Sequence, residues 1–259
     1  MQTTNIRTKQ KVVIALKTYA RTMEEWVHPI DRTKKLRPSA ANSFLLGVMF
    51  DRNIDADKAW EAGEWINDSL GDLNDPSTLW KALVTIDKKQ LIGFLRYGYG
   101  GKAFHRYYRT FANQLPKAAK HILQKYNGDP RRIWNSRRDI TKVRESLEDI
   151  PGIGQALSRM AVLILARNFG LLGGKSALPQ LDIKTDVQLM RVFKRTGLIA
   201  TRASTNDAIE TAQKLFPKFP AVLDAPAWEI GRKWCHPRNP ECKGCPITRV
   251  CPKIMKFGT

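Results

Sequence analysis

The residue types with the most specific chemistry lie at the C-terminal end of the chain, where all four cysteines are found. Six, two and five residues separate Cys235, Cys242, Cys245 and Cys251, and no cysteine precedes them. A disulfide framework would spread its cysteines through the fold, so this short cluster is typical of one metal site. Four thiolates can bind either zinc or an iron–sulfur cluster. The single C-x2-C pair with wider arms favours the cluster, and zinc stays the alternative.

A second pattern, PGIGQ, stands between two amphipathic stretches. Pro151 cannot continue the preceding helix, and Gly152 can adopt a positive φ. Ile153 can fill the apolar space between two helices, and Gly154 lets another molecule approach the backbone. The first amides of a helix that begins at Gln155 can then bind a phosphate, assisted by the helix dipole. A plain turn between two helices is the alternative interpretation.

The composition favours a polyanionic partner. The chain has 259 residues and a net charge of +20, from 44 lysines and arginines against 24 acidic residues. Lysine and arginine contacts to phosphates dominate non-specific affinity for nucleic acid. No apolar run approaches the ~20 residues that span a bilayer, so we expect no membrane association. The basic N-terminus shows neither a long apolar core nor a cleavage-like site, so we expect no signal peptide.

The hydrophobic pattern predicts an all-α protein. Apolar residues recur at spacings of three and four over most of the chain, and strand patterning is almost absent. Glycine- and proline-rich turns separate these stretches. The segment 32–38 is a linker candidate, and a second boundary lies near 171–184. We expect helices over 12–23, 43–50, 56–67, 77–87, 104–125, 140–147, 155–169, 187–196, 206–216 and 223–232.

Three segments in order resemble the endonuclease III-like branch of the helix-hairpin-helix (HhH-GPD) DNA glycosylases. LEDIPGIGQALSRMAVLILA is similar to the hairpin of that family. TDVQLMRVFKRTGL is similar to the segment in which an aspartate opens a helix of pattern D-x-x-x-x-R-V-x-x-R. The cysteine spacing is similar to the family's C-terminal [4Fe–4S] loop. Residues 40–70 resemble the family only loosely.

The resemblance implies a two-lobed all-α fold with the active site in the cleft between the lobes. One lobe would be a helical barrel over 39–180 that carries the hairpin, and the other a cluster domain from 1–38 and 181–259. The function implied is excision of a damaged, mismatched or modified base from double-stranded DNA in base excision repair. The family likeness also implies a monomer with a structural [4Fe–4S] cluster, in the cytoplasm and near the nucleoid of a prokaryote.

By the same resemblance, Asp186 matches the catalytic aspartate of the family, and its place before a helix also fits an N-cap. Asp182 is a competing carboxylate. Relatives that also cleave the DNA strand carry a lysine two residues after the second hairpin glycine, where this chain has Ala156. The resemblance therefore implies a monofunctional glycosylase in which water attacks the sugar. A lyase that uses Lys184 or Lys175 is one alternative, and a non-catalytic lesion-binding protein is another.

Further candidates follow from looser matches. Asn53 falls at the place of the family's wedge, which fills the gap left by a flipped base, and a loop cap is its alternative role. Gly47 stands where adenine-excising relatives place a glutamate, so adenine is disfavoured as substrate. Aromatic and basic residues alternate over 97–111, where they suit either a base pocket or a helix packed into the core. The wedge and pocket candidates are Asn53, Asp51, Arg52, Tyr97, Tyr99 and His105, and the phosphate-contact candidates are Lys184, Arg232, Lys233, Arg238 and Lys243.

Overall fold

The computed structural model describes residues 5–23, 36–135 and 139–255. In these ranges every regular element is a helix, and the one β-type pairing is an isolated bridge between Tyr99 and Lys102. The all-α fold expected from the hydrophobic pattern is therefore confirmed. No helix among the described residues has the length and apolar character needed to cross a bilayer.

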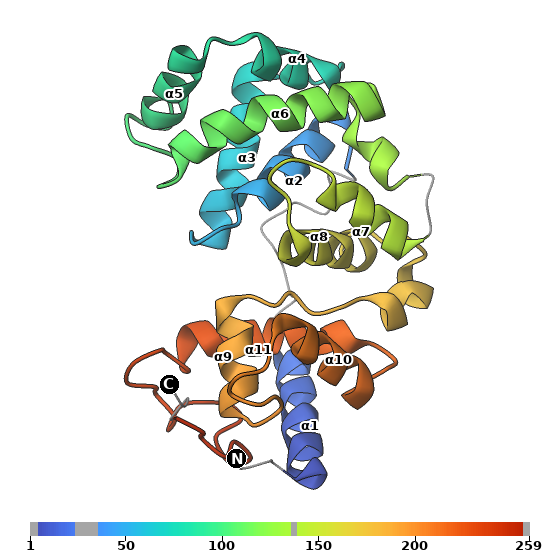
Figure 1. Ribbon diagram of the computed structural model, residues 1–259, viewed down its shortest axis with the longest axis vertical. Coiled ribbons are helices and arrows are strands. Elements are labelled where there is room, and N and C mark those ends of the chain that lie inside the picture. Colours follow the sequence, from blue (N-terminus) through green and yellow to red (C-terminus); the bar gives the residue numbers. More distant parts are fainter. Residues whose placement is uncertain (1–4, 24–35, 136–138, 256–259) are drawn as a thin grey trace. The chain divides into compact units, whose positions relative to one another are not determined.

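The chain divides into two compact units (Figure 1). One comprises Met1–Trp26 with Lys175–Thr259, and the other comprises Val27–Gly174. The domain limits expected at 38 and 180 stay predictions. The linker candidate over 32–38 lies mostly outside the described residues.

The Val27–Gly174 unit is built around α2, which is buried along most of its length. α2 packs closely on α3, because two glycines at the crossing carry no side chain. A Cβ at Gly63 would lie 2.7 Å from the Ser43 carbonyl oxygen, and a Cβ at Gly47 would lie 2.0 Å from the Trp60 ring. The place of the glutamate in adenine-excising relatives is thus covered by an indole ring. The helices of this unit are α2 (Pro38–Phe50), α3 (Ala56–Leu70), α4 (Ser77–Thr85), α5 (Lys88–Tyr97), α6 (Tyr108–Tyr126), η2 (Pro130–Ile133), α7 (Ile140–Glu148) and α8 (Gln155–Arg167).

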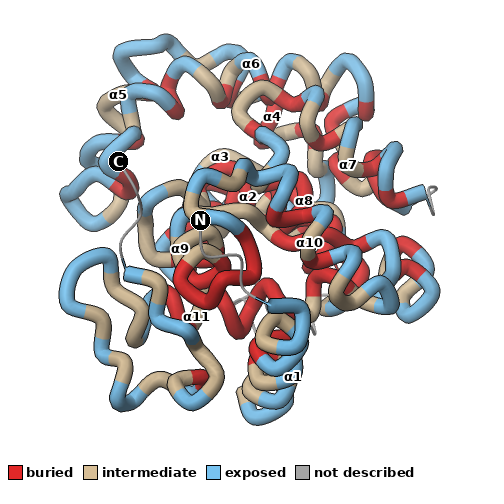
Figure 2. Tube along the Cα trace, turned by 60° about the horizontal axis from the view of Figure 1, so that its bottom comes forward, coloured by how far each residue is buried: buried red, intermediate tan, exposed pale blue. Residues whose placement is uncertain are grey.

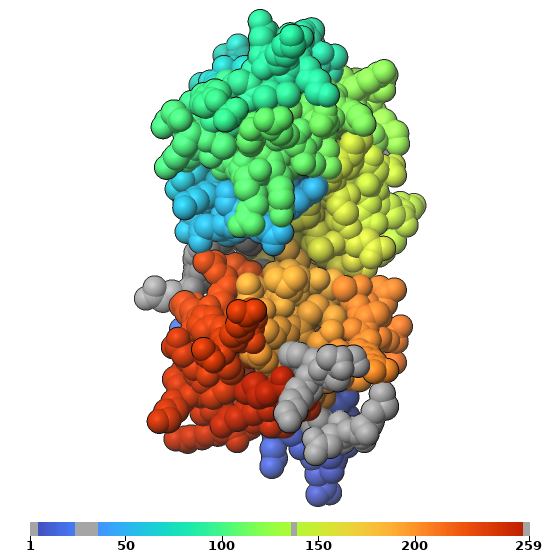
Figure 3. Space-filling model, turned by 60° about the vertical axis from the view of Figure 1, so that its left-hand side comes forward, coloured from blue at the N-terminus to red at the C-terminus, as the bar shows by residue number. Residues whose placement is uncertain are grey.

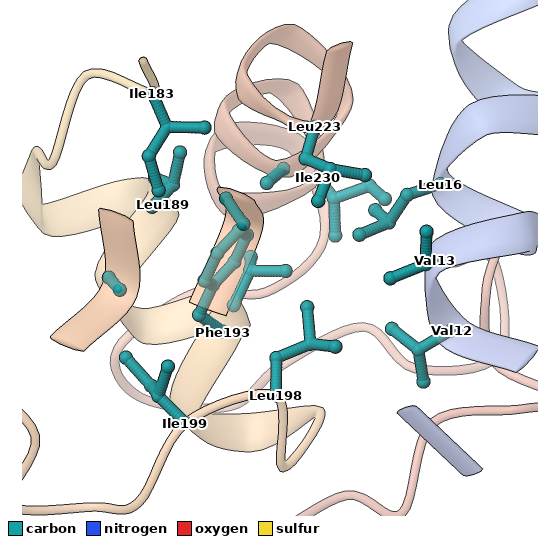
Figure 4. Close-up of a cluster of buried hydrophobic side chains, with 14 of the residues drawn as sticks. Val12, Val13, Leu16, Ile183, Leu189, Phe193, Leu198, Ile199, Leu223 and Ile230 are labelled. Atoms are coloured by element: carbon teal, nitrogen blue, oxygen red, sulfur yellow. The ribbon is translucent and has the colours of Figure 1, made fainter. Parts of the chain in front are cut away.

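The other unit has its own hydrophobic core between α1, α9 and α11 (Figure 4). α1 is exposed or half-buried apart from one buried strip, whereas α11 is buried over most of its first turns (Figure 2). Phe193 of α9, Leu16 of α1 and Ile230 of α11 are almost fully buried in this core. Burial of one such side chain stabilises the fold by about 1.5–3 kcal/mol. Its helices are α1 (Ile6–Thr22), η3 (Gly174–Gln180), α9 (Val187–Arg195), α10 (Thr205–Leu215), η4 (Pro220–Leu223) and α11 (Asp224–Lys233).

Two helix predictions in the Val27–Gly174 unit need correction. A separate helix, α5, follows α4, because the backbone becomes extended at Ile86 and Asp87 then caps α5 through the amides of Lys89 and Gln90. The helix expected from residue 104 begins only at Tyr108. The segment before it is held by a buried histidine instead, so the aromatic residues there are not on one helical face.

Candidate functional site

The hairpin between α7 and α8 has the local geometry expected from PGIGQ. Gly152 has φ +106°, a value that favours glycine, and the buried Ile153 donates its N–H to the Ile150 carbonyl at 2.9 Å. The two helices are also tied by Ser158, whose hydroxyl donates to Glu148 Oε1 at 2.6 Å. Hydrogen bonds within the turn and between its two flanking helices therefore fix its conformation without a ligand.

The two hairpin glycines differ in their surroundings. A Cβ at Gly152 would lie 3.2 Å from Met49 Cε and 3.6 Å from Arg52 Nη2. At Gly154, which is exposed with φ −102° and ψ 179°, an added Cβ would meet no atom within 4 Å. No side chain caps α8 at Gly154, and Gln155 is exposed. The chain therefore needs Gly152 for its own conformation, whereas among the described residues neither backbone angle nor a neighbouring atom requires a glycine at position 154.

Arg52 is the wedge-region residue that the structure brings to the hairpin. Its guanidinium lies beside Gly152, and its Cζ is 5.6 Å from the centroid of the Phe111 ring. Burial lowers the pKa of Arg52 from its ordinary value. Arginine stays protonated at neutral pH even so, and it places a fixed positive charge at the exposed turn.

His105 supports this turn from within the core. It is 2% exposed, its Nδ1 accepts the Tyr107 N–H at 2.9 Å, and its Nε2 lies 2.9 Å from the Arg52 carbonyl oxygen. Because Nδ1 accepts, the ring proton is on Nε2 and donates to that carbonyl. Burial, with the charges of Arg106 and Arg52, lowers the pKa of His105, so the ring stays neutral. Both ring nitrogens form hydrogen bonds to the backbone. His105 therefore holds the turn at Arg52 in place and is not itself exposed.

Of the other wedge and pocket candidates, two are exposed and two are half-buried. Asn53 is exposed with φ +52°, and its Nδ2 donates to the Tyr107 hydroxyl at 3.2 Å. Tyr97 is 56% exposed, with the Arg96 guanidinium over its ring. Tyr99 is half-buried and donates its hydroxyl to Glu61 at 3.1 Å. Asp51 is half-buried at the C-terminal end of α2.

Asp186 lies at the head of α9 as its N-cap. Its Oδ1 accepts the N–H groups of Gln188 and Leu189, both at 2.9 Å. The residue is half-buried, and Val187 next to it is 68% exposed. The capping role expected from the sequence is present, and it leaves the carboxylate at the surface of its unit.

The competing carboxylate and the alternative amines have other surroundings. Asp182 is 7% exposed and accepts a hydrogen bond from Gln213 Nε2 at 2.8 Å. Lys184 is half-buried, and its backbone N–H donates to Asp224 Oδ2. Lys175 is exposed in η3. Ala156 is half-buried as the second residue of α8.

The four cysteines line one hollow, together with Val192, Ile230, Trp234 and Ile247. Each is half-buried, and none forms a disulfide. The loop that carries them follows α11 and forms part of the orange-red surface of its unit in Figure 3. The four cationic candidates of this region, Arg232, Lys233, Arg238 and Lys243, are all exposed.

Two arginines on α9 hold the start of the cysteine loop. Arg195 is 4% exposed and donates through Nη1 to the His236 carbonyl at 2.6 Å and through Nη2 to the Pro237 carbonyl at 2.9 Å. The same Nη1 lies 3.3 Å from Cys235 Sγ. Arg191 donates through Nε to the Cys235 carbonyl at 2.5 Å. These bonds join the helix capped by Asp186 to the first cysteine.

The donor set of the hollow fits a thiolate-bound metal group. Burial, with the charge of neighbouring thiols, raises the pKa of Cys251 to about 11 and that of Cys245 above its ordinary value. A bound cation would reverse this, because coordination deprotonates thiols. Donors aimed at the sulfurs, from Arg195 and the Lys253 N–H at 3.4 Å from Cys251 Sγ, suit charged ligands. Over the described ranges no three His, Cys, Asp or Glu side chains gather as ligands of a single ion.

Three residues of this arrangement escaped the sequence analysis. Tyr107 lies in the aromatic and basic segment 97–111 and is 38% exposed, in contact with Asn53. Arg195 was visible as the last letter of the D-x-x-x-x-R-V-x-x-R pattern, but its partner lies 40 positions away. Asp224 had no sequence signal beyond an acidic residue at a helix start.

The helices, the hairpin and the cysteine loop define a protein of the endonuclease III fold. The solved structure of a trapped endonuclease III–DNA covalent intermediate matches with a TM-score of 0.66 at 19% identity, covering 95% of this chain and 96% of that one. A non-covalent endonuclease III–DNA complex matches at 0.64 and 20%, covering 95% of each chain. A thermostable thymine-DNA glycosylase matches at 0.60 and 17%, covering 95% and 96%.

In sequence, the chain is 26% identical over 152 residues to endonuclease III of Thermotoga maritima. The match covers 58% of this chain and 61% of that relative, so it spans less than two thirds of the relative's length. No family model matches the chain. The resemblance to the endonuclease III-like helix-hairpin-helix glycosylases is thereby confirmed.

Proposed function

We propose that the protein is a DNA glycosylase that flips a damaged, mismatched or modified base out of duplex DNA and hydrolyses its N-glycosidic bond. The observation that carries the proposal is Asp186. It is a half-buried carboxylate at the head of α9, within the D-x-x-x-x-R-V-x-x-R segment of a chain with the endonuclease III fold. The net charge of +20 suits a polyanionic partner. We expect a monomer in base excision repair.

The reaction is hydrolysis. As the bond between C1′ and the base nitrogen breaks, its electron pair leaves with the base, and positive charge develops on the sugar. The Asp186 carboxylate stabilises that charge and accepts a proton from the attacking water. The oxygen of water bonds to C1′, and the departing base takes up a proton. The products are the free base and an abasic site in an unbroken strand.

Ala156 supports a monofunctional reaction. Strand cleavage by this class of enzyme requires an amine that forms a Schiff base with C1′. A methyl group at this position in the first turn of α8 cannot do so. Lys184 is the nearest amine in sequence to Asp186, and we assign it to phosphate contact rather than to attack.

The hairpin supports the DNA contact. The exposed Gly154 and the uncapped start of α8 offer backbone amides at the positive end of a helix dipole. The Arg52 guanidinium beside Gly152 adds a cation to the same surface. Asn53, exposed beside Tyr107, is our candidate for the residue that fills the gap left by the flipped base.

Cys235, Cys242, Cys245 and Cys251 would hold a [4Fe–4S] cluster. With four thiolate ligands, the cluster would supply structural order rather than an open coordination site. The chain's own contribution is the cationic loop around it, with Arg232, Lys233, Arg238 and Lys243 exposed for contact with phosphates. Absorbance near 400 nm and iron content distinguish the cluster from zinc.

A base-release screen tests the proposal. The full chain is incubated with duplexes that carry deaminated, mismatched, oxidised, alkylated or hypermodified bases, and each reaction is analysed with and without alkali. We expect one class of base to be released, with strand breaks only after alkali, and no protein–DNA adduct after borohydride. An adduct would replace the monofunctional assignment by a lyase. Tight binding to a lesion duplex with no release from any would overturn the glycosylase assignment.

Gly154→Ala should weaken DNA binding without weakening the fold. The residue has φ −102° and open space at Cβ, so alanine costs no strain. The added methyl group would stand between the backbone amides and a phosphate. The loss of one charge-assisted hydrogen bond predicts a Kd roughly tenfold higher, measured by fluorescence anisotropy on a lesion duplex.

Gly93→Ala is the matched control for this variant. Gly93 lies inside α5 of the same unit and likewise has no atom within 4 Å of an added Cβ. Both variants should unfold at or above the wild-type temperature, since alanine favours the chain's conformation at each site. If Gly154→Ala and Gly93→Ala bind DNA equally well, the backbone amides beside Gly154 do not bind a DNA phosphate.

A further inference from the structure

Asp224 is a buried carboxylate that the proposed reaction does not use. It is 5% exposed at the first residue of α11. Its Oδ2 accepts the backbone N–H of Lys184, and the carbonyl of Lys184 accepts the N–H of Asp186 at 2.9 Å. A chain of two hydrogen bonds therefore runs from the start of α11 to the residue that caps α9.

The segment before α9 is anchored at several points. Ala221 donates its N–H to the Leu181 carbonyl at 3.1 Å, and Gln213 holds Asp182 at 2.8 Å. Ile183 is fully buried in the hydrophobic core. Among these anchors, the one through Asp224 holds Lys184, which lies two residues before Asp186 and accepts its N–H. A displacement of about 1 Å at a reacting group can cost about 100-fold in rate, so this anchor bears directly on the proposed chemistry.

The electrostatics of Asp224 are unusual for a structural residue. The pKa of Asp224 is raised to about 7, chiefly by burial and also by the charge of Asp186. The Lys184 N–H and the Lys184 charge act in the opposite direction. Burial of a charge is costly, so a neutral acceptor would be favoured over a carboxylate if the side chain only had to accept one hydrogen bond. Here the carboxylate changes its charge near neutral pH, next to a second carboxylate.

We propose that Asp224 is the positioning residue for Asp186: it holds the Lys184 amide from the start of α11, and thereby fixes the carboxylate that assists base release. The inference rests on the glycosylase function proposed above. Ionised Asp224 accepts the Lys184 N–H in a charge-assisted bond, which is roughly twice as strong as a neutral one. Protonation weakens this bond, so base release should slow as the pH falls through about 7. The charged groups that bear on Asp224 are Asp186 and Lys184.

Asp224→Asn tests the proposal, with Asp182→Asn as its matched control. Both aspartates are buried and both hold the segment before α9, but Asp182 accepts a hydrogen bond from the Gln213 side chain, whereas Asp224 accepts the Lys184 backbone N–H. Single-turnover rates of base release are measured from pH 5.5 to 8.5, alongside the Kd for DNA. For Asp224→Asn we expect a 10- to 100-fold lower rate at pH 8, a flat profile around pH 7 and an unchanged Kd. Asp182→Asn should keep the wild-type profile.

A wild-type rate and profile in Asp224→Asn would overturn the inference. If wild type releases no base, the proposed function has failed, and that result is separate from any difference between variants. If Asp224→Asn does not fold, the wild-type protein is titrated by carbon NMR with hydrogen exchange of the Lys184 amide. An Asp224 midpoint near 4, or rapid exchange of that amide at pH 8, would also overturn it. A midpoint near 7, with faster exchange of the amide below it after correction for pH, supports it.

Discussion

Replacing Asp186 by asparagine should reduce the rate of base release on the order of 10³-fold while leaving the Kd for lesion DNA within a few-fold of wild type. Asparagine keeps the side-chain oxygen that accepts the N–H groups of Gln188 and Leu189, and asparagine caps helices as well as aspartate does. The fold should therefore survive. What is lost is the negative charge opposite the developing sugar cation and the proton acceptor for water. Single-turnover release and anisotropy on the same duplex measure the two quantities.

Asp139 provides the control for capping. It is the N-cap of α7 and accepts the N–H groups of Thr141 and Lys142 at 3.0 and 3.2 Å, in the same pattern as Asp186 at α9. Alanine at either position should cost about 1 kcal/mol of stability. Only the change at Asp186 should stop base release. Equal rates for Asp186→Asn and wild type would mean that the aspartate is a cap and nothing more.

The parts of the fold that local chemistry determines were predictable from the sequence. Apolar spacing of three and four located most helices, and the place of Asp186 before a helix indicated its capping role. The start of α6 was not, since residues 104–107 have helical spacing. The reason is long-range: His105 binds the Arg52 carbonyl, 53 positions earlier, and a buried polar ring satisfied in this way outweighs local propensity.

The candidate site divides in the same way. Residue type and spacing pointed to the cysteines and the hairpin glycines, because each set belongs to a short pattern with its own chemistry. Asp186 followed from the resemblance of its segment to the glycosylase family. Asp224 and Arg195 could not be found by that route. Their importance lies in partners 40 positions away, and an aspartate or arginine on an amphipathic helix is ordinarily solvated. Only the folded chain distinguishes them from surface charges.

Arg195→Met should weaken both the unit that carries the cysteine loop and its retention of iron. The guanidinium is 4% exposed and donates to the carbonyls of His236 and Pro237 at 2.6 and 2.9 Å, with Cys235 Sγ at 3.3 Å. Methionine fills a similar volume but leaves these acceptors unpaired. An unpaired buried acceptor costs about 1–3 kcal/mol, but His236 is half-buried and Pro237 is exposed, so water replaces part of what is lost and a total loss of about 2 kcal/mol is expected. Thermal unfolding and iron per chain after gel filtration are the measurements.

Lys194→Met is the control, because Lys194 precedes Arg195 on α9 and carries the same charge outside these hydrogen bonds. It should retain wild-type iron and stability within about 0.5 kcal/mol. Arg195→Lys should fall between the two, since a single ammonium group keeps the charge but cannot span both carbonyls as the planar guanidinium does. Iron content and unfolding temperature in Arg195→Met equal to those in Lys194→Met would show that the loop is held by its cysteines alone.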